Sequence, residues 1–144
     1  MSYRALARSA PPLFLPLGLL ARLPYAMTPL GTLLVLESAG SHTFAGVAAG
    51  AQSVAIAVGG LAAGALAARV GARRLGMVLA VLNALAVLGL ALASGRAAMF
   101  AAAVLVGLTQ PHVGLLVRVH WSAALDRSPL LRTGFAYEGA ADEL

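Results

Sequence analysis

Long runs without a charged residue constrain this 144-residue chain more than any other feature. Residues 45–68 and residues 75–93 contain no Asp, Glu, Lys or Arg. Hydrophobic residues make up 60% of the chain and charged residues only 10%, whereas a soluble domain carries about 25% charged residues. A disordered chain would instead be rich in charge and poor in apolar residues. The composition therefore predicts a membrane protein.

Four apolar runs reach the length of about 20 residues that a membrane-spanning helix needs. The connections between them are only a few residues long, so neighbouring helices should run antiparallel. We predict an all-α fold, a polytopic bundle of four transmembrane helices within residues 13–117. The four predicted spans are residues 13–36, 45–68, 75–93 and 97–117. The remaining segments are predicted to be a cytoplasmic N-terminal segment (1–12), a cytoplasmic loop (118–132) and the start of a fifth helix (133–144).

The arginines predict the orientation of this bundle. All ten basic residues are arginine, and in a four-span topology eight of them fall on one side, opposite Arg96, Glu37 and His42. Positive charge concentrates on the cytoplasmic side of membrane proteins, so both termini should be cytoplasmic and the chain a multi-pass protein of the cell (inner) membrane. The basic residues form no stripe with interleaved aromatics, which argues against a nucleic-acid partner. The eight are Arg4, Arg8, Arg69, Arg73, Arg74, Arg118, Arg127 and Arg132.

Several other classes of protein are disfavoured. The chain has no cysteine, which excludes disulfides and cysteine-ligated metals. It contains no Gly-x-Ser-x-Gly, phosphate-loop or His-Glu-x-x-His motif, and its three histidines should lie at different depths, so neither an enzyme nor a cofactor or metal site is predicted. A cleaved signal peptide is the competing interpretation of the N-terminus, but Pro16 interrupts its apolar core and Ala21-Arg22-Leu23 is a poor cleavage site. Abundant Ala, Gly, Leu and Arg without lysine suggest a high-GC bacterial gene.

Polar residues within the predicted spans are the candidates for a site. Arg22 either lines a central cavity, where it would bind an anionic group, or reaches the cytoplasmic headgroups on its long stem. Gln110-Pro111-His112 should interrupt the fourth span, and His112 serves either an interhelical hydrogen bond or proton coupling. Gln52 and Asn83 are predicted to form interhelical hydrogen bonds. The candidates for the cavity and substrate are Arg22, Tyr25, Gln110, His112, Glu138 and Asp142.

Small residues in the second span predict close helix packing. Gly46 and Gly50 form one Gly-x-x-x-Gly pattern, and Gly60 and Gly64 form another. Glycines spaced by four residues let helix backbones approach closely in membranes. We expect these contacts to be internal to the bundle, because a multi-span protein has many helix contacts to make.

The turn after the second span resembles the signature loop of the major facilitator superfamily, whose pattern is Gly-x-Leu-Ala-Asp-Arg-x-Gly-Arg-Arg. The aspartate of that pattern is replaced by Ala68, so the charge contact that it makes in the family lacks its acid here. A similar, weaker likeness covers Pro111-His112-Val113-Gly114 with Arg118 to Trp121, and the tail from Ala136 to Glu143 resembles the start of the family's fifth helix. The matching loop residues are Gly64, Leu66, Arg69, Gly71, Arg73 and Arg74. Independently of the family, the segment is predicted to be a tight turn in which Gly71 adopts the backbone angles that a chain reversal needs.

This resemblance implies a secondary transporter that moves a small molecule by alternating access between two six-helix halves, with proton coupling and efflux as expectations from the family. The chain would then be an N-terminal fragment with four of twelve helices, and its partners would be the lipid bilayer, an unidentified substrate and the missing C-terminal helices. In the parent protein Arg22 would face Glu138 and Asp142, which lie four residues apart. The alternatives are a four-helix membrane protein without transport activity (an anchor or assembly partner) and a complete dimeric small multidrug transporter.

Overall fold

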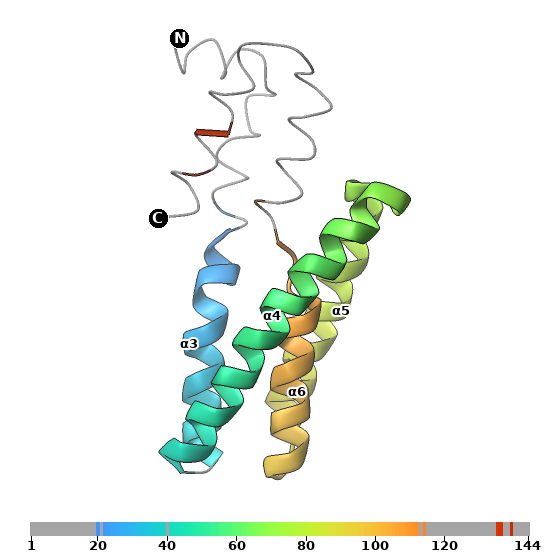
Figure 1. Cartoon of the computed structure of the whole chain (residues 1–144). Helices are drawn as coiled ribbons and strands as arrows, with labels where there is room; N and C mark the ends of the chain where they lie inside the picture. The colour runs from blue at the N-terminus through green and yellow to red at the C-terminus, as the bar shows by residue number, and fades with distance from the viewer. Residues whose placement is uncertain are drawn as a thin grey trace. The chain divides into compact units, whose positions relative to one another are not determined.

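Four helices make up the described part of the chain. In a computed structural model, the described residues are Leu20, 22–39, 41–112, Gly114, Phe135, Ala136 and Gly139. Residues 25–111 form one compact unit, and the account below concerns that unit. The described residues contain helices and no strand. The helices are α3 (Arg22–Ala39), α4 (His42–Val70), α5 (Ala72–Leu92) and α6 (Arg96–Thr109) (Figure 1).

Two of these helices are long and apolar enough to cross a membrane, namely α4 and α5. At 1.5 Å per residue, the 29 residues of α4 extend about 43 Å and the 21 residues of α5 about 32 Å. Both lengths exceed the roughly 30 Å of a bilayer's hydrocarbon core. The predicted spans 45–68 and 75–93 therefore correspond to helices of spanning length, each of which begins three residues earlier than predicted.

The other two helices, as the structure describes them, cover only part of the predicted spans. The structure describes α3 from Arg22 onward, and residues 13–19 of the predicted first span lie outside the described residues. α6 has 14 residues and extends only about 21 Å. The interruption predicted at Gln110-Pro111-His112 is present, because α6 ends at Thr109. Gln110 has φ −60° and ψ 121°, the extended conformation that a following proline favours.

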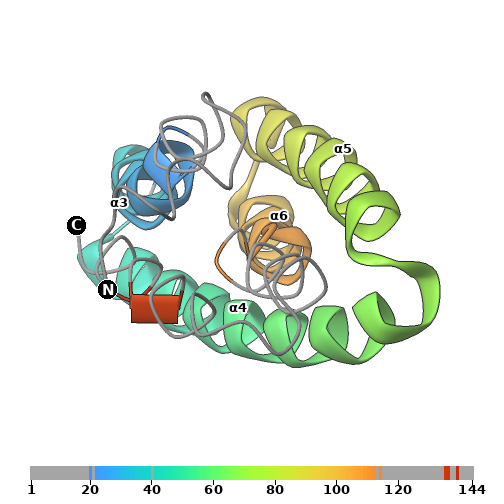
Figure 2. The same ribbon diagram turned by 90° about the horizontal axis from the view of Figure 1, so that it is seen from above.

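Within the unit, α6 packs against both α4 and α5 (Figure 2). The main buried cluster joins all four helices through small or branched side chains. Its fully buried members include Leu36 of α3, Ala45 and Ala48 of α4, and Ala103 and Val106 of α6. A second cluster joins the far end of α4 to the start of α5 through Ala63, Ala67 and Leu75.

The burial pattern of α4 is the reverse of that in a soluble protein. Its large apolar residues point outward, and Leu61 is 80% exposed while Val54 is 64% exposed. Soluble proteins bury their large aliphatic side chains preferentially, whereas helices in membranes place small residues at their contacts. The buried face of α4 consists of Ala45, Ala48, Gln52, Ala55, Gly59, Ala63 and Ala67.

Two glycines bring α4 and α6 into backbone contact. A Cβ atom added to Gly59 would collide with the carbonyl oxygen of Leu108, and one added to Gly107 would lie 2.5 Å from the carbonyl oxygen of Gln52. Each glycine therefore directs an α-hydrogen at a carbonyl of the other helix, the geometry of a Cα–H···O contact. By contrast, Gly46 and Gly50 have no atom of the described structure within 4 Å of an added Cβ. The close approach predicted at that pair does not occur among the described helices.

The turn between α4 and α5 depends on a glycine, as predicted. Gly71 has φ +89° and ψ 137°, a backbone conformation that costs a residue with a side chain of the order of 1–3 kcal/mol. Its amide donates to the carbonyl of Ala67 and so ends α4. The α3–α4 and α5–α6 turns lie together at the opposite end of the unit, because the Arg96 guanidinium lies 5.9 Å from the centre of the Phe44 ring.

We expect Gly59→Ala and Gly107→Ala each to destabilise the protein by about 1–3 kcal/mol, because the added methyl group overlaps backbone or packed atoms. Gly50→Ala is the matched control, because its methyl group meets open space. It should raise stability by up to about 1 kcal/mol through helix propensity alone. Thermal or denaturant unfolding in mild detergent, followed by circular dichroism, measures these changes. Equal stability of all three variants would contradict the backbone contact between α4 and α6.

Candidate functional site

The broken end of α6 gathers the polar side chains of the unit. A helix that stops inside an apolar bundle leaves carbonyl groups without amide partners. Here the Gln110 amide donates to Gly107 at 3.3 Å, and Pro111 has no N–H to donate. The carbonyl of Val106, four residues before Gln110, therefore lacks its usual helical donor. Five residues from all four helices meet near this point, and we call them the polar cluster: Thr32, Gln52, Asn83, Thr109 and Gln110.

Asn83 of α5 supplies the missing donor. Its Nδ2 donates to the Val106 carbonyl at 2.9 Å and lies 3.3 Å from Oγ1 of Thr109. The Thr109 hydroxyl in turn donates to the Leu105 carbonyl at 2.7 Å. Asn83 is half-buried in the middle of α5, where its neighbours along the helix are apolar. The interhelical hydrogen bond predicted for Asn83 is thus present, and its acceptor is a backbone carbonyl that the helix break exposes.

Gln52 of α4 joins the same end of α6 to α3. Its Nε2 donates to Oγ1 of Thr32 at 3.2 Å, and both side chains are almost completely buried. Gly107 packs directly on the backbone of Gln52. The interhelical hydrogen bond predicted for Gln52 is confirmed. It links α3 to the contact between α4 and α6.

Gln110 is the member of the cluster with unused hydrogen-bonding capacity. It is 2% exposed, and its Nε2 donates to the backbone carbonyl of Tyr25 at 3.3 Å. Its Oε1 is buried and accepts no hydrogen bond from any described residue. An unsatisfied buried acceptor costs about 1–3 kcal/mol. The site therefore presents one buried oxygen that can accept a hydrogen bond from a donor outside the described structure.

The other predicted cavity residues are only partly described. The main chain of Tyr25 belongs to the site, but its side chain is 40% exposed. The backbone of Arg22 begins α3, and its side chain lies outside the described residues, as do Glu138 and Asp142. His112 is half-buried just beyond the end of α6. The predicted contact between Arg22 and the two acids stays a prediction.

The predicted loop motif forms an exposed turn. Arg69, Arg73 and Arg74 are exposed, and they make no hydrogen bond or ion pair with described residues. Gly64 and Gly60 are half-buried, whereas Leu66 is 47% exposed. Three arginines thus lie at the α4–α5 end of the unit without a counter-ion among the described residues.

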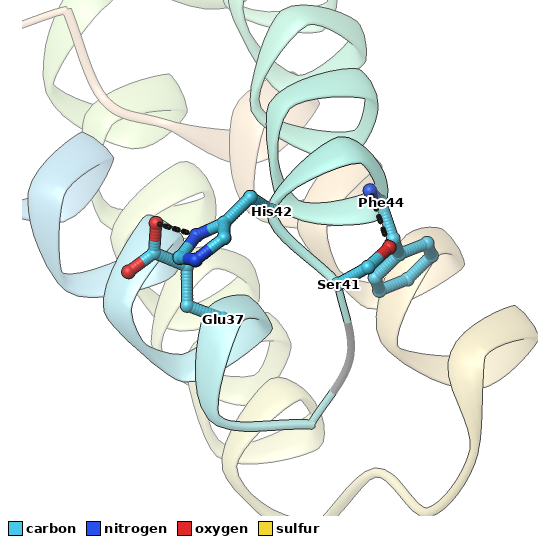
Figure 3. A network of polar contacts seen from close by, with 4 residues as sticks. All are labelled: Glu37, Ser41, His42 and Phe44. Atoms are coloured by element: carbon cyan, nitrogen blue, oxygen red, sulfur yellow. Dashed lines mark hydrogen bonds and ion pairs between the residues drawn. The ribbon is translucent and has the colours of Figure 1, made fainter.

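The opposite end carries a different set of polar groups (Figure 3). The His42 ring faces the carboxylate of Glu37, with Nδ1 and Oε1 separated by 3.2 Å, and the Ser41 hydroxyl accepts from the Phe44 amide to cap α4. Arg96 lies at this end, over the Phe44 ring. Glu37, His42 and Arg96 therefore share one end, and the three arginines of the loop motif lie at the other end of α4.

The site offers no cluster of metal ligands in the part of the chain that the structure describes. Comparison of the chain with models of protein families, with curated proteins and with solved structures finds no match.

The interhelical contacts of four residues were not predicted from the sequence, namely those of Thr32, Thr109, Gly59 and Gly107. The two threonines carry no signal of their own, because threonine is common in helices of either environment. Their partners, Gln52 and Asn83, were the detectable signals, since an amide in an apolar run needs a hydrogen-bond partner.

We expect the Gln52–Thr32 contact to couple α3 to α4 with about 0.6 kcal/mol, and at most about 1.7 kcal/mol, the range measured for hydrogen bonds within membranes. A double-mutant cycle with Gln52→Leu, Thr32→Val and the double variant, followed by unfolding in mixed micelles, measures this coupling. Asn83→Leu combined with Thr32→Val is the control pair, because no hydrogen bond between Asn83 and Thr32 is present among the described contacts. A coupling energy of zero for Gln52 and Thr32 would show that the bond does not form.

Proposed function

We propose that this chain is a multi-pass membrane protein that contributes the N-terminal helices of a secondary transporter of the major facilitator type. The observation that carries the proposal is the polar cluster at the broken end of α6, where Gln110 Oε1 has no hydrogen-bond donor among the described residues, inside helices whose outer faces are apolar. The moved solute is a small molecule, and coupling to protons or another ion belongs to the same proposal. The proposal also places the protein in the inner membrane with its N-terminus in the cytoplasm.

The distribution of polar and apolar groups supports the membrane location. In the most apolar stretches of α4 and α5, only 22% and 11% of the residues are buried in the structure. Core helices of a soluble protein would be mostly buried, because exposed apolar faces of this size are unfavourable in water. In a bilayer the same faces contact lipid. The three exposed arginines at the α4–α5 turn then meet the headgroups on the cytoplasmic side.

The interrupted helix supports a transport site. Irregular backbone at membrane depth is tolerated where it is buried in protein or lines a water-filled cavity. Transporters use such discontinuous helices to form binding sites from unwound backbone and nearby side chains. Gln110 fits this role, because it lies just after the last turn of α6 and its buried Oε1 accepts no hydrogen bond from the part of the chain that the structure describes. A substrate donor such as a hydroxyl, an amine or an amide N–H would satisfy it.

The alternative of a membrane anchor or assembly partner has one observation in its favour. Four members of the polar cluster are satisfied by other groups of the bundle, which is also what a purely structural network requires. Gln52 and Asn83 point into the bundle rather than to its outside, which favours the transporter. A complete dimeric multidrug transporter is less favoured, because Glu37, the only acid of α3, pairs with His42 near the end of the helix.

The absence of native cysteine makes accessibility labelling a direct test. We expect Gln110→Cys to react in intact membranes with a water-soluble maleimide, because the transport site must open to water on one side. Leu61→Cys and Val81→Cys should stay unlabelled, although these positions are 80% and 61% exposed in the structure, because lipid covers them. Arg73→Cys at the α4–α5 turn is the positive control.

The two other outcomes separate the hypotheses. In a soluble protein, cysteine at the exposed positions 61 and 81 would be labelled rapidly, and cysteine at the buried position 110 would be protected. In a membrane protein without a transport site, cysteine at all three of these positions would be unreactive and only the turn would be labelled. Either pattern would contradict the proposed function.

Topology is tested independently with reporter fusions in growing cells. Fusions after Gly40 and Arg96 should report an external location, and fusions after Gly71 and Arg127 a cytoplasmic one, because the arginine-rich turns stay inside. Replacing Arg69, Arg73 and Arg74 together by glutamine should weaken or mix this pattern. A cytoplasmic signal at Arg96 would overturn the four-span topology.

A further inference from the structure

We propose that Pro29 positions the candidate site: it withholds a helical amide from the Tyr25 carbonyl, and the Gln110 amide that donates there is left with Oε1 to offer to a ligand. The ligand must then carry an N–H or O–H donor. This class of ligand rests on the proposed transport site, whereas the positioning of Gln110 by Pro29 does not.

Proline inside α3 removes the amide that would donate to a carbonyl one turn earlier. α3 runs from Arg22 to Ala39 with Pro29 inside it. In a regular helix the amide of residue 29 donates to the carbonyl of residue 25, but proline has no N–H and its ring displaces that carbonyl. The Tyr25 carbonyl accepts from Nε2 of Gln110 at 3.3 Å. Gln110 thus supplies to α3 a donor that Pro29 lacks.

The second half of α3 is held in place independently of this bond. Thr32, three residues after Pro29, accepts a hydrogen bond from Gln52 of α4. Leu36 is fully buried in the main buried cluster. The described residues of α3 before Thr32 are exposed or half-buried. Gln110 therefore reaches, from the end of α6, a part of α3 that lies outside the main buried cluster.

The same bond fixes which end of the Gln110 amide points away from Tyr25. A backbone carbonyl can only accept, so it pairs with Nε2 and not with Oε1. Turning the amide over would place two acceptor oxygens opposite each other with no proton between them. The side chain is 2% exposed, so water does not relieve that arrangement. Oε1 therefore stays directed away from Tyr25, and no described residue donates to it.

A buried acceptor fixed in this way selects its ligand by chemistry. An N–H or O–H group can donate to Oε1, whereas a carboxylate or a fully substituted amide has only acceptors. A ligand without a donor would leave the buried oxygen of Gln110 without a hydrogen bond, which opposes binding. The site should therefore prefer solutes with a donor over solutes of similar size that can only accept.

NMR of the full chain in detergent micelles tests the positioning directly. Gln52 and Gln110 are the only glutamines of the chain, so isotope-labelled glutamine gives two side-chain amides, and Gln52 is the internal reference. Pro29→Ala should shift the Gln110 amide signals and speed their proton exchange with water, because the restored amide at position 29 competes for the Tyr25 carbonyl. Gly31→Ala is the matched control, because its methyl group meets open space on the same helix and supplies no donor.

A thermodynamic cycle measures the same link as an unfolding equilibrium in detergent. Gln110→Leu should raise the unfolding constant about three-fold less in the Pro29→Ala background than in the wild type, the average effect of a hydrogen bond within membranes. In the Gly31→Ala background it should act as in the wild type. Equal effects of Gln110→Leu in all three backgrounds, or Gln110 signals that Pro29→Ala leaves unchanged, would overturn the positioning role of Pro29.

Two neutral amides test the class of ligand, because N-methylacetamide has an N–H and N,N-dimethylacetamide has none. We expect N-methylacetamide to shift the Gln110 Cδ signal saturably, with an apparent dissociation constant about five-fold lower than that of N,N-dimethylacetamide. The Gln52 signals should not respond. Equal responses to the two amides, or no response, would contradict the donor requirement. If Gln110→Cys still reacts with the maleimide in that case, only the ligand class is wrong, and if it does not, the transport site itself is contradicted.

Discussion

The backbone contact between α4 and α6 is the interaction on which the rest of this unit depends. Gly59 and Gly107 each lie directly against a backbone carbonyl of the other helix. A rotation or a shift of either helix would therefore bring larger side chains into collision with that backbone. The contact fixes Gln52 beside the last turn of α6, and Gln52 then reaches Thr32 of α3. With α6 held against α4, Asn83 of α5 meets the carbonyls at the α6 terminus. A single close crossing therefore determines which polar groups can find one another.

The end of α6 shows how a helix can stop in an apolar environment at low cost. Proline at position 111 removes one amide donor, and the extended Gln110 moves another out of helical register. Each freed carbonyl would be costly in hydrocarbon. Asn83 satisfies Val106, the Thr109 hydroxyl adds a bond to Leu105, and an α-hydrogen of Gly59 faces Leu108. Nearby groups therefore contact almost all of the carbonyls that the helix end leaves without an amide donor. Within the polar cluster, Gln110 Oε1 is the buried acceptor that has no donor among the described residues.

The helical class, the two long helices, the glycine turn at Gly71 and the break at Gln110 could all be predicted from the sequence. These features depend on local chemistry: hydropathy over a window, a positive φ angle and the missing N–H of proline. The packing face of α4 could not be predicted, because small and large apolar residues alternate all round the helix and leave no polar side to orient it. Gly46 and Gly50 therefore looked as suitable for packing as Gly59. Thr32 and Thr109 became meaningful only once the fold placed them within reach of two amides.

Two different surroundings are needed to explain the polarity of α6. On the side facing α4 it buries Gly107 and Gln110 among groups that hydrogen-bond. On another side it presents alanines and Leu105 to an apolar groove that lies between α5 and α6. Thr109 belongs to both sides, since its hydroxyl bonds within the cluster while the residue lines the inner end of the groove. Water could solvate the first side but would make the second unfavourable, and lipid does the opposite. A helix with this division is stable where a polar interior and an apolar exterior meet, as they would for a helix between the proposed transport site and a bilayer.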